Sequence, residues 1–384
     1  MKSDLILHIG AHKTGTTTIQ HALSQNRAAL EARGLSYVTA GNRPQVHHLL
    51  GRVSGESMMR GHRLAAPEEL SRILHAAPTD RVLMSSENFS FFFDEKEIRE
   101  LARHLRKHFR RVRILTYLRR QDSHAVSHHQ EGSKPLRKAE RDVFGNGLAP
   151  LPEHPMMDHY LDYGRRIGNW MNVFGDENVE IRVFERNRLI AGDAWTDFLN
   201  AIDIEPNGLI PAEQRNQSQG LTKTRVGHLM NAKDMPADLH RLVSAVLPDD
   251  ARMTPGRHEA MAFYARYRSG NVALNARMGA IGGDDIFDDD FASYPETALA
   301  NWSEEAATGA IEALLDVIRQ LTEATSADTL RDTALLAERQ GLDALALSLM
   351  SAAALQRPNG PLINNKLREL RERIGTDPKT PGHT

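Results

Sequence analysis

Short apolar runs that end at polar or glycine residues recur through the first half of the chain. Leu5 to Ile9 is a mostly apolar run that stops at Gly10, and its length is typical of a buried strand rather than a helix. Similar runs predict strands at 35–38, 82–86, 112–118 and 179–184. Apolar residues at helical spacing predict helices from Gly15 to Gly34, over 94–109, from about 122, over 160–174 and over 194–202. Strands that alternate with helices favour an α/β fold with a central parallel sheet.

The strand signal fades beyond about residue 206. Residues 221–280 and 303–323 have helical patterns, and the Ala- and Leu-rich stretch 326–374 predicts two or three more helices. Residues 41–66 show no clear period, which predicts a loop or a short helix. We therefore expect a core over 1–205, a mostly helical continuation over 206–325, and a helical extension with a frayed tail over 326–384.

Composition narrows the class of protein. The chain has 384 residues, is 40% hydrophobic and 26% charged, and can therefore bury a sizeable core. Its 48 basic and 50 acidic residues argue against a general nucleic-acid coat, and the lack of cysteine excludes disulfides, thiolate zinc sites and a cysteine nucleophile. No window approaches the ~20 apolar residues of a membrane span, and no signal peptide is expected. These features predict a soluble, cytoplasmic protein.

The loop between the first strand and the first helix carries the features of an anion site. Gly10 and Gly15 have the spacing G-x-x-x-x-G, Lys13 lies inside the loop, and hydroxyls follow at 16–18. Such a loop directs backbone N–H groups and a helix N-terminus toward one point, where a phosphate or sulfate is the natural ligand. An ATP-binding P-loop places its lysine directly after the second glycine, where this chain has Thr16. That difference argues against an ATP-dependent kinase.

A second basic motif follows the strand at 112–118. Arg119 and Arg120 come directly after the strand, and Ser127 lies eight residues after Arg119 in the next predicted helix. Arginine can hold a phosphate through two hydrogen bonds, and serine can donate a third. Because ligands lie at the carboxyl ends of strands in a doubly wound sheet, the two motifs together suggest a nucleoside that carries phosphates at both ends.

The two motifs resemble those of sulfotransferases that use 3′-phosphoadenosine 5′-phosphosulfate (PAPS). The run from His12 to Thr17 is similar to the family's 5′-phosphosulfate loop, and the run from Tyr117 to Ser127 is similar to its 3′-phosphate motif. The resemblance covers roughly residues 4–205 and is greatest to the bacterial branch. It implies a P-loop-like, three-layer α/β/α fold with a helical C-terminal extension, PAPS as co-substrate, 3′,5′-adenosine bisphosphate as product, and no required metal.

The resemblance also implies roles for individual residues. Lys13 would contact the phosphosulfate bridge and the transferring group, and Arg119 and Ser127 would hold the 3′-phosphate. The 5′-phosphate would be bound by Gly15, Thr16, Thr17 and Thr18, and Thr14 would be a further contact of the donor. In some branches a late basic loop closes over the 3′-phosphate, for which residues 215–225 are the candidate here.

The catalytic base is expected at another strand end. Glu87 follows the strand at 82–86, as the glutamate of glycan-modifying relatives does, and a carboxylate there could accept the acceptor's proton. His12, beside Lys13, is the alternative base. Three residues of the helix after Arg119 could line the acceptor cleft, although a solvated helix face explains the two histidines more simply: His124, His128 and Glu131.

The predicted reaction is sulfuryl transfer from PAPS to an acceptor hydroxyl on a carbohydrate or glycoconjugate, with 206–325 completing the acceptor side. The alternatives are an ATP-dependent P-loop kinase and a non-catalytic protein that binds a nucleotide or a partner. No nucleic-acid partner is expected. No bound metal is expected either, since the adjacent histidine pairs at 47–48 and 128–129 cannot easily face one ion. The helices of 326–374 faintly resemble one tetratricopeptide-like hairpin, which must pack on the enzyme or contact a protein partner.

Overall fold

The computed structural model describes residues 1–39, 44–53, 61–135, 149–151, 154–213, 219–279, 283–324 and 326–374, with the backbone alone for 320–324. The chain divides into two compact units. The first comprises Met1–Ser244 and Pro248–Ser303, and the second comprises Ala245–Leu247 and Glu304–Thr384. The helix predicted at 303–323 therefore groups with the C-terminal helices. The tail after 374 lies outside the described residues.

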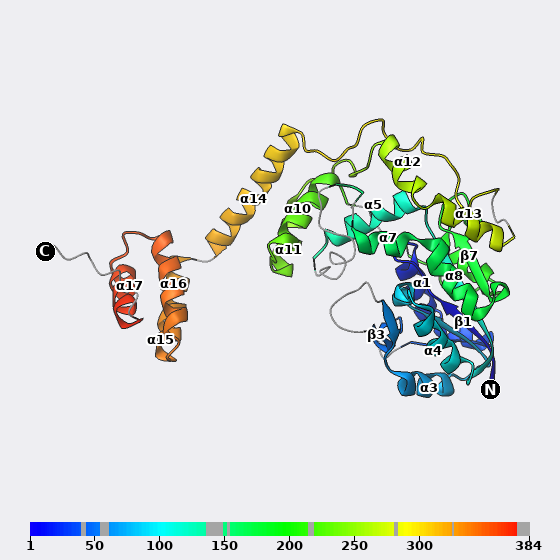
Figure 1. The fold of residues 1–384 in the computed structure, drawn as a ribbon. Coiled ribbons are helices and arrows are strands. Elements are labelled where there is room, and N and C mark those ends of the chain that lie inside the picture. Colours follow the sequence, from blue (N-terminus) through cyan, green and yellow to red (C-terminus); the bar gives the residue numbers. More distant parts are fainter. Residues whose placement is uncertain are drawn as a thin grey trace. The chain divides into compact units, whose positions relative to one another are not determined.

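A parallel five-stranded sheet forms the centre of the first unit (Figure 1). Its strand order is β2-β5-β1-β6-β7, and all five strands lie where the apolar runs predict them. The predicted α/β fold class with a central parallel sheet is confirmed. The strands of this sheet are β1 (Lys2–His8), β2 (Leu35–Tyr37), β5 (Arg81–Ser85), β6 (Phe109–Leu118) and β7 (Val179–Val183).

Helices cover both faces of the sheet. Leu5 and Leu7 of β1 pack into one buried cluster, whereas Ile6 between them packs into a second cluster on the opposite face. This alternation follows from the two-residue period of a strand. Trp195 and Phe198 belong to the second cluster with the first helices of the chain, and Trp170 belongs to the first cluster. The result is the predicted three-layer α/β/α arrangement.

Most helices of the first unit lie where they are predicted, but α3 (Pro67–Ala76) has no predicted counterpart and α7 (Pro155–Leu161) lies mostly before the helix predicted at 160–174. One predicted helix is interrupted at Asn26, whose side chain donates to the carbonyl of Ala22 (2.9 Å) and accepts from the backbone of Ile210 (2.7 Å). The helices are α1 (Thr16–Gln25), α2 (Arg27–Ala32), α3 (Pro67–Ala76), α4 (Glu95–Leu105), α5 (Gln121–Gly132), α7 (Pro155–Leu161), α8 (Tyr163–Phe174), α9 (Ala194–Ala201), α10 (Leu221–Ala232), α11 (Ala237–Val246), α12 (Arg257–Ala265) and α13 (Arg268–Arg277).

The described parts of the irregular region, residues 44–53 and 61–66, contain more structure than their pattern predicts. A short antiparallel hairpin pairs β3 (Leu50–Arg52) with β4 (His62–Leu64), and a 3-10 turn at His47–Leu49 precedes it. Strands of three residues are too short to show a period, which is why the pattern predicts only a loop or short helix. Further 3-10 turns lie at Glu87–Phe91, Asp176–Asn178 and Ile190–Gly192.

The order in which the chain adds strands to the sheet reverses between β1 and β6. These two strands are parallel neighbours, with His8 opposite Leu115. From β1 the chain continues to β2 at one edge, and from β6 it continues to β7 at the other edge. In open α/β sheets such a switch point leaves a crevice at the carboxyl ends of the strands. The loops after β1 and β6, which hold the two basic motifs, both begin there.

The second unit consists largely of helices with a small core of its own. Ala346, Met350 and Ala353 of α16 are fully buried against residues of α15 and α17. The predicted two or three C-terminal helices are thus three helices. In the described part of the chain, no helix combines the length and apolarity that crossing a bilayer requires. The helices of this unit are α14 (Glu304–Ala324), α15 (Ala327–Arg339), α16 (Asp343–Gln356) and α17 (Pro361–Ile374).

Candidate functional site

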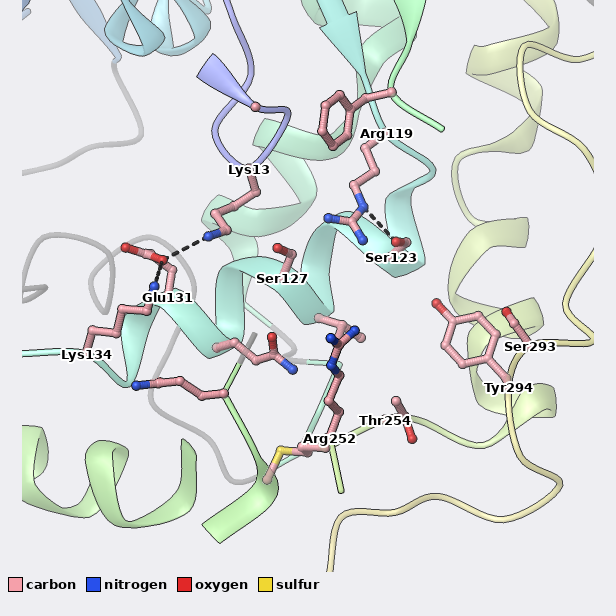
Figure 2. Close-up of a pocket in the computed structure, with 16 residues that line it drawn as sticks. Lys13, Arg119, Ser123, Ser127, Glu131, Lys134, Arg252, Thr254, Ser293 and Tyr294 are labelled. Atoms are coloured by element: carbon pink, nitrogen blue, oxygen red, sulfur yellow. Dashed lines mark hydrogen bonds and ion pairs between the residues drawn. The ribbon is translucent and has the colours of Figure 1, made fainter. Parts of the chain in front are cut away.

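A cavity of about 490 Å³ lies at the switch point, between the loop after β1 and helix α5 (Figure 2). Its volume falls in the range of small-molecule sites, roughly 300–1,000 Å³. Lys13 and Gly15 of the first motif and Arg119 and Ser127 of the second all line it. The other lining residues are Ser123, Val126, Gln130, Glu131, Lys134, Phe184, Gln219, Arg252, Met253, Thr254, Ser293 and Tyr294.

The loop after β1 has a constrained backbone. Lys13 adopts a left-handed conformation with φ of 63°, which a residue with a side chain rarely takes up and which is common at functional sites. Gly15 also has a positive φ of 77°, and a Cβ there would lie 2.9 Å from the ring of Phe184. Helix α1 starts at Thr16, so its first backbone N–H groups have no partner within the helix.

Four polar residues at intervals of four line the cavity, one just before helix α5 and three on it. Arg119 precedes the helix, and Ser123, Ser127 and Glu131 follow along one face, as residues at i and i+4 do. From Ser123 to Glu131 the helix rises by about 12 Å at 1.5 Å per residue. Figure 2 shows Ser127 between the two ends of this row. The α5 face therefore gives the cavity an Arg119 end and a Glu131 end.

The Arg119 end is pre-oriented by a hydrogen bond within the motif. Arg119 donates from Nε to the Ser123 hydroxyl over 2.7 Å, and Figure 2 shows its two terminal nitrogens in the cavity. Those nitrogens form the planar fork that suits a phosphate. The sequence pairs Arg119 with Ser127, and the structure adds Ser123 as the residue that holds the guanidinium.

The Glu131 end is an ion-pair cluster. Lys13 Nζ lies 2.9 Å from Glu131 Oε2, and Lys134 Nζ lies 2.8 Å from the same oxygen. Burial alone would raise the pKa of Glu131, but the charges of Lys13 and Lys134 lower it to about 2. Burial lowers the pKa of Lys13, and Glu131 acts against that effect. With Arg119 and Arg252, the described lining of the cavity has four cationic side chains against one carboxylate, which favours an anionic ligand.

Two predicted site residues make hydrogen bonds that stabilise the loop instead of lining the cavity. The His12 backbone N–H and Nδ1 each lie 3.0 Å from the Tyr160 hydroxyl. The fully buried Thr14 hydroxyl donates to the Ala11 carbonyl over 2.6 Å. Neither His12 nor Thr14 is among the described residues that line the cavity.

The remaining hydroxyls of the loop also lie away from the cavity lining. Thr16 is 3% exposed, and its methyl group lies against Gly10. Thr17 is exposed and Thr18 is half-buried. Thr16, Thr17 and Thr18 can therefore serve an anion through their backbone N–H groups at the start of α1.

Glu87 lies directly after β5, as predicted, but it turns into the protein interior. It is 7% exposed, accepts from Gln20 Nε2 over 3.0 Å, and lies 3.2 Å from His47 Nε2. Burial would raise the pKa of this carboxyl, but the hydrogen bond from His47 and the charge of His12 hold it well below its usual range. The described lining of the cavity does not include Glu87.

His124 and His128 lie in the core rather than on a solvated helix face. Their rings stack 4.7 Å apart, and both side chains are at most 1% exposed. His124 Nδ1 bonds the Tyr163 hydroxyl over 2.5 Å. Burial lowers the pKa of both imidazoles well below the ordinary value. Of the three cleft residues predicted on this helix, the cavity is lined by Glu131 alone.

The cavity wall opposite α5 comes from segments that the motifs do not contain. Arg252 and Thr254 precede α12, and Tyr294 lies seventeen residues after the end of α13 (Figure 2). Arg252 is exposed, and no charge pattern in the sequence marks it. The predicted late basic segment 215–225 falls partly on 214–218, which lie outside the described residues. In its described part, Gln219 reaches the cavity.

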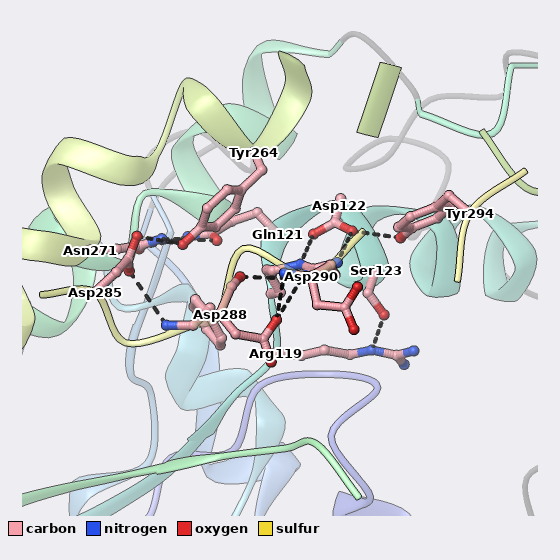
Figure 3. A network of polar contacts seen from close by, with 12 residues as sticks. Arg119, Gln121, Asp122, Ser123, Tyr264, Asn271, Asp285, Asp288, Asp290 and Tyr294 are labelled. Atoms are coloured by element: carbon pink, nitrogen blue, oxygen red, sulfur yellow. Dashed lines mark hydrogen bonds and ion pairs between the residues drawn. The ribbon is translucent and has the colours of Figure 1, made fainter. Parts of the chain in front are cut away.

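A buried polar network attaches this second wall to the start of α5 (Figure 3). Arg120 contacts both carboxylate oxygens of Asp122 (2.9 and 3.2 Å) and also Asp288 (3.0 Å) and the carbonyl of Asp290 (2.6 Å). Tyr294 donates to Asp122 over 2.6 Å. The two neighbouring arginines therefore have different surroundings. Arg119 faces the cavity, whereas Arg120 holds the second wall to the start of α5.

No cluster of three or more histidine, aspartate or glutamate side chains suited to a metal ion occurs among the described residues.

Among known proteins, the similarity found is to solved structures. No protein-family model matches the chain, and no curated protein matches it either. The crystal structure of a sulfotransferase from Alicyclobacillus acidocaldarius is similar, with 15% sequence identity and a TM-score of 0.40, over 73% of this chain and 96% of that one.

Proposed function

We propose that the protein is a sulfotransferase that moves the sulfuryl group of PAPS to an acceptor hydroxyl. One observation carries the proposal: the lysine loop after β1 and the arginine–serine row of α5 line the same cavity. A ligand with an anionic group at each end of a nucleoside fits that arrangement. The adenosine would lie between the two ends, along the α5 face.

The 3′-phosphate would bind at the Arg119 end. The terminal nitrogens of Arg119 would hold two of its oxygens, and Ser127 would donate to a third. Arg252, which lines the facing wall without a described ion pair, would approach the same group from the other side. This residue takes the place proposed from the sequence for 215–225.

The phosphosulfate would bind at the lysine end. Backbone N–H groups from Gly15 to Thr18 would hold the 5′-phosphate at the start of α1. Lys13 would leave its ion pair with Glu131 and contact the bridging oxygen and the transferring group. As the S–O bond to the phosphate breaks, negative charge grows on that oxygen, and the ammonium group stabilises it.

The rest of the proposal concerns the acceptor and the base. The acceptor would be a hydroxyl on a carbohydrate or glycoconjugate, the location cytoplasmic, and no metal ion would be required. The sequence-based candidates for the base are Glu87 and His12, neither of which is among the described residues that line the cavity.

Isothermal titration calorimetry tests the donor assignment against an ATP-dependent kinase. We expect 3′,5′-adenosine bisphosphate to bind without a metal ion, and ATP with magnesium to bind at least tenfold more weakly. Tight binding of ATP with magnesium, without binding of the bisphosphate, would overturn the proposal. Consumption of ³⁵S-labelled PAPS then separates an enzyme from a non-catalytic nucleotide-binding protein.

A further inference from the structure

We propose that Glu131 is the general base of the transfer and is released for that role when the donor binds. The inference rests on the proposed function, because it assigns a residue to the same cavity. It starts from the position of the carboxylates. Glu131 is the one carboxylate among the described residues that line the cavity, whereas Glu87 is buried behind the loop.

Glu131 lies at the end of the cavity where the chemistry would occur. Its Oε2 is 2.9 Å from Nζ of Lys13, the residue expected at the breaking bond. It is also one helical turn beyond Ser127, away from the Arg119 end. An acceptor oxygen must come within about 3–3.5 Å of the sulfur to react. A carboxylate one hydrogen bond from Lys13 is therefore within reach of that oxygen, directly or through one water molecule.

Donor binding changes the surroundings of this carboxylate. Among the described residues, the charged groups that contact Glu131 are Lys13, from the loop after β1, and Lys134, two residues beyond the end of α5. When Lys13 turns to the phosphosulfate, Glu131 loses one of these two ion pairs. The incoming negative charge of the donor also favours protonation of a nearby carboxylate. The base therefore becomes stronger when the donor is in place.

The step balances without another reactant. The acceptor oxygen forms a bond to sulfur, and the bond between sulfur and the bridging oxygen breaks. The acceptor's proton moves to the Glu131 carboxylate, and the electron pair of the broken bond stays on the 5′-phosphate of 3′,5′-adenosine bisphosphate. Lys13 neutralises that charge, and the proton on Glu131 passes to solvent after the products leave.

The test compares Glu131→Gln with Glu87→Gln, since each replaces a carboxylate with an amide of the same shape. Binding of 3′,5′-adenosine bisphosphate is measured first by calorimetry. Consumption of labelled PAPS is then measured with water as acceptor and with the best acceptor from a panel of mono- and oligosaccharides. We expect Glu131→Gln to bind the bisphosphate as tightly as the wild type or more tightly. We expect it to consume PAPS about 10²–10⁴-fold more slowly.

The direction of the rate change distinguishes a general base from a residue that only pairs with Lys13. If Glu131 only masked the lysine, Glu131→Gln would consume PAPS as fast as the wild type or faster, which would overturn the inference. A larger rate loss in Glu87→Gln with normal bisphosphate binding would also overturn it. Glu131→Asp, which keeps the carboxylate, should retain more activity than Glu131→Gln, and equal losses in both would count against a base.

Failure of the proposed function gives a different result. A wild-type protein that does not bind 3′,5′-adenosine bisphosphate refutes the sulfotransferase proposal itself. A wild-type protein that binds the bisphosphate but consumes PAPS no faster than buffer refutes the assignment of a base to this cavity.

Discussion

Replacement of Arg119 by glutamine should selectively weaken binding of the donor's 3′-phosphate. The Nε of Arg119 is held by Ser123, which leaves two terminal nitrogens to face the cavity. Each charge-assisted hydrogen bond contributes about 1.5–3 kcal/mol. Loss of the pair, partly replaced by the glutamine amide and water, should therefore cost about 3 kcal/mol, or roughly 100-fold in Kd.

Two ligands and a control variant isolate this effect. Calorimetry should show the roughly 100-fold loss for 3′,5′-adenosine bisphosphate and little change for adenosine 5′-phosphosulfate, which lacks the 3′-phosphate. Arg111→Gln is a matched control, because Arg111 is exposed near the opposite end of the same strand, β6. An equal loss for both ligands, or no loss for the bisphosphate, would refute the assignment of Arg119 to the 3′-phosphate.

Three other substitutions, and a control for one of them, test the cavity and the core around it. Lys13→Ala should slow PAPS consumption by about 10²–10³-fold, and an unchanged rate would remove Lys13 from the transfer step. Asp122→Asn should lower the free energy of unfolding by about 3–5 kcal/mol, because it breaks a buried ion pair, whereas Asp288→Asn at a half-exposed site should cost far less in urea unfolding. Burial lowers the pKa of His8 to about 4 in the folded protein. The unfolded chain therefore binds a proton at this histidine at higher pH, and the free energy of unfolding falls as the pH drops from 6.5 to 4. His8→Gln should reduce that fall by up to roughly 3 kcal/mol, and an unchanged pH profile would contradict the prediction.

The fold could be predicted because its strands carry short apolar runs that become buried. β1, β5 and β6 are covered by helices on both faces, and each ends in a run of at least four buried residues, directly before the loop begins. The hairpin of β3 and β4 could not be predicted this way, since each strand has three residues.

The site could be predicted only where its residues are close in sequence. Lys13 and Gly15 share one loop, and Arg119 and Ser127 share one strand end and its helix, so spacing places them together. The second wall requires tertiary information, because Arg252 and Tyr294 reach the cavity from segments that no local pattern connects.

Glu87 illustrates a different limit. Its position at a strand end follows from the apolar run before it, but the direction of its side chain depends on partners elsewhere. Gln20 of α1 and His47 of the irregular region supply those partners. Position on the helix after Arg119 already predicted Glu131 as a cleft residue, and the structure places it in the cavity lining, at the fourth position of the row from Arg119.

A crystal structure with 3′,5′-adenosine bisphosphate tests the central claim most directly. The account predicts the 5′-phosphate at the start of α1, with Lys13 turned from Glu131 toward it, and the 3′-phosphate between Arg119 and Ser127. A bisphosphate bound in reverse, or bound in this cavity with contacts to one motif alone, would contradict it.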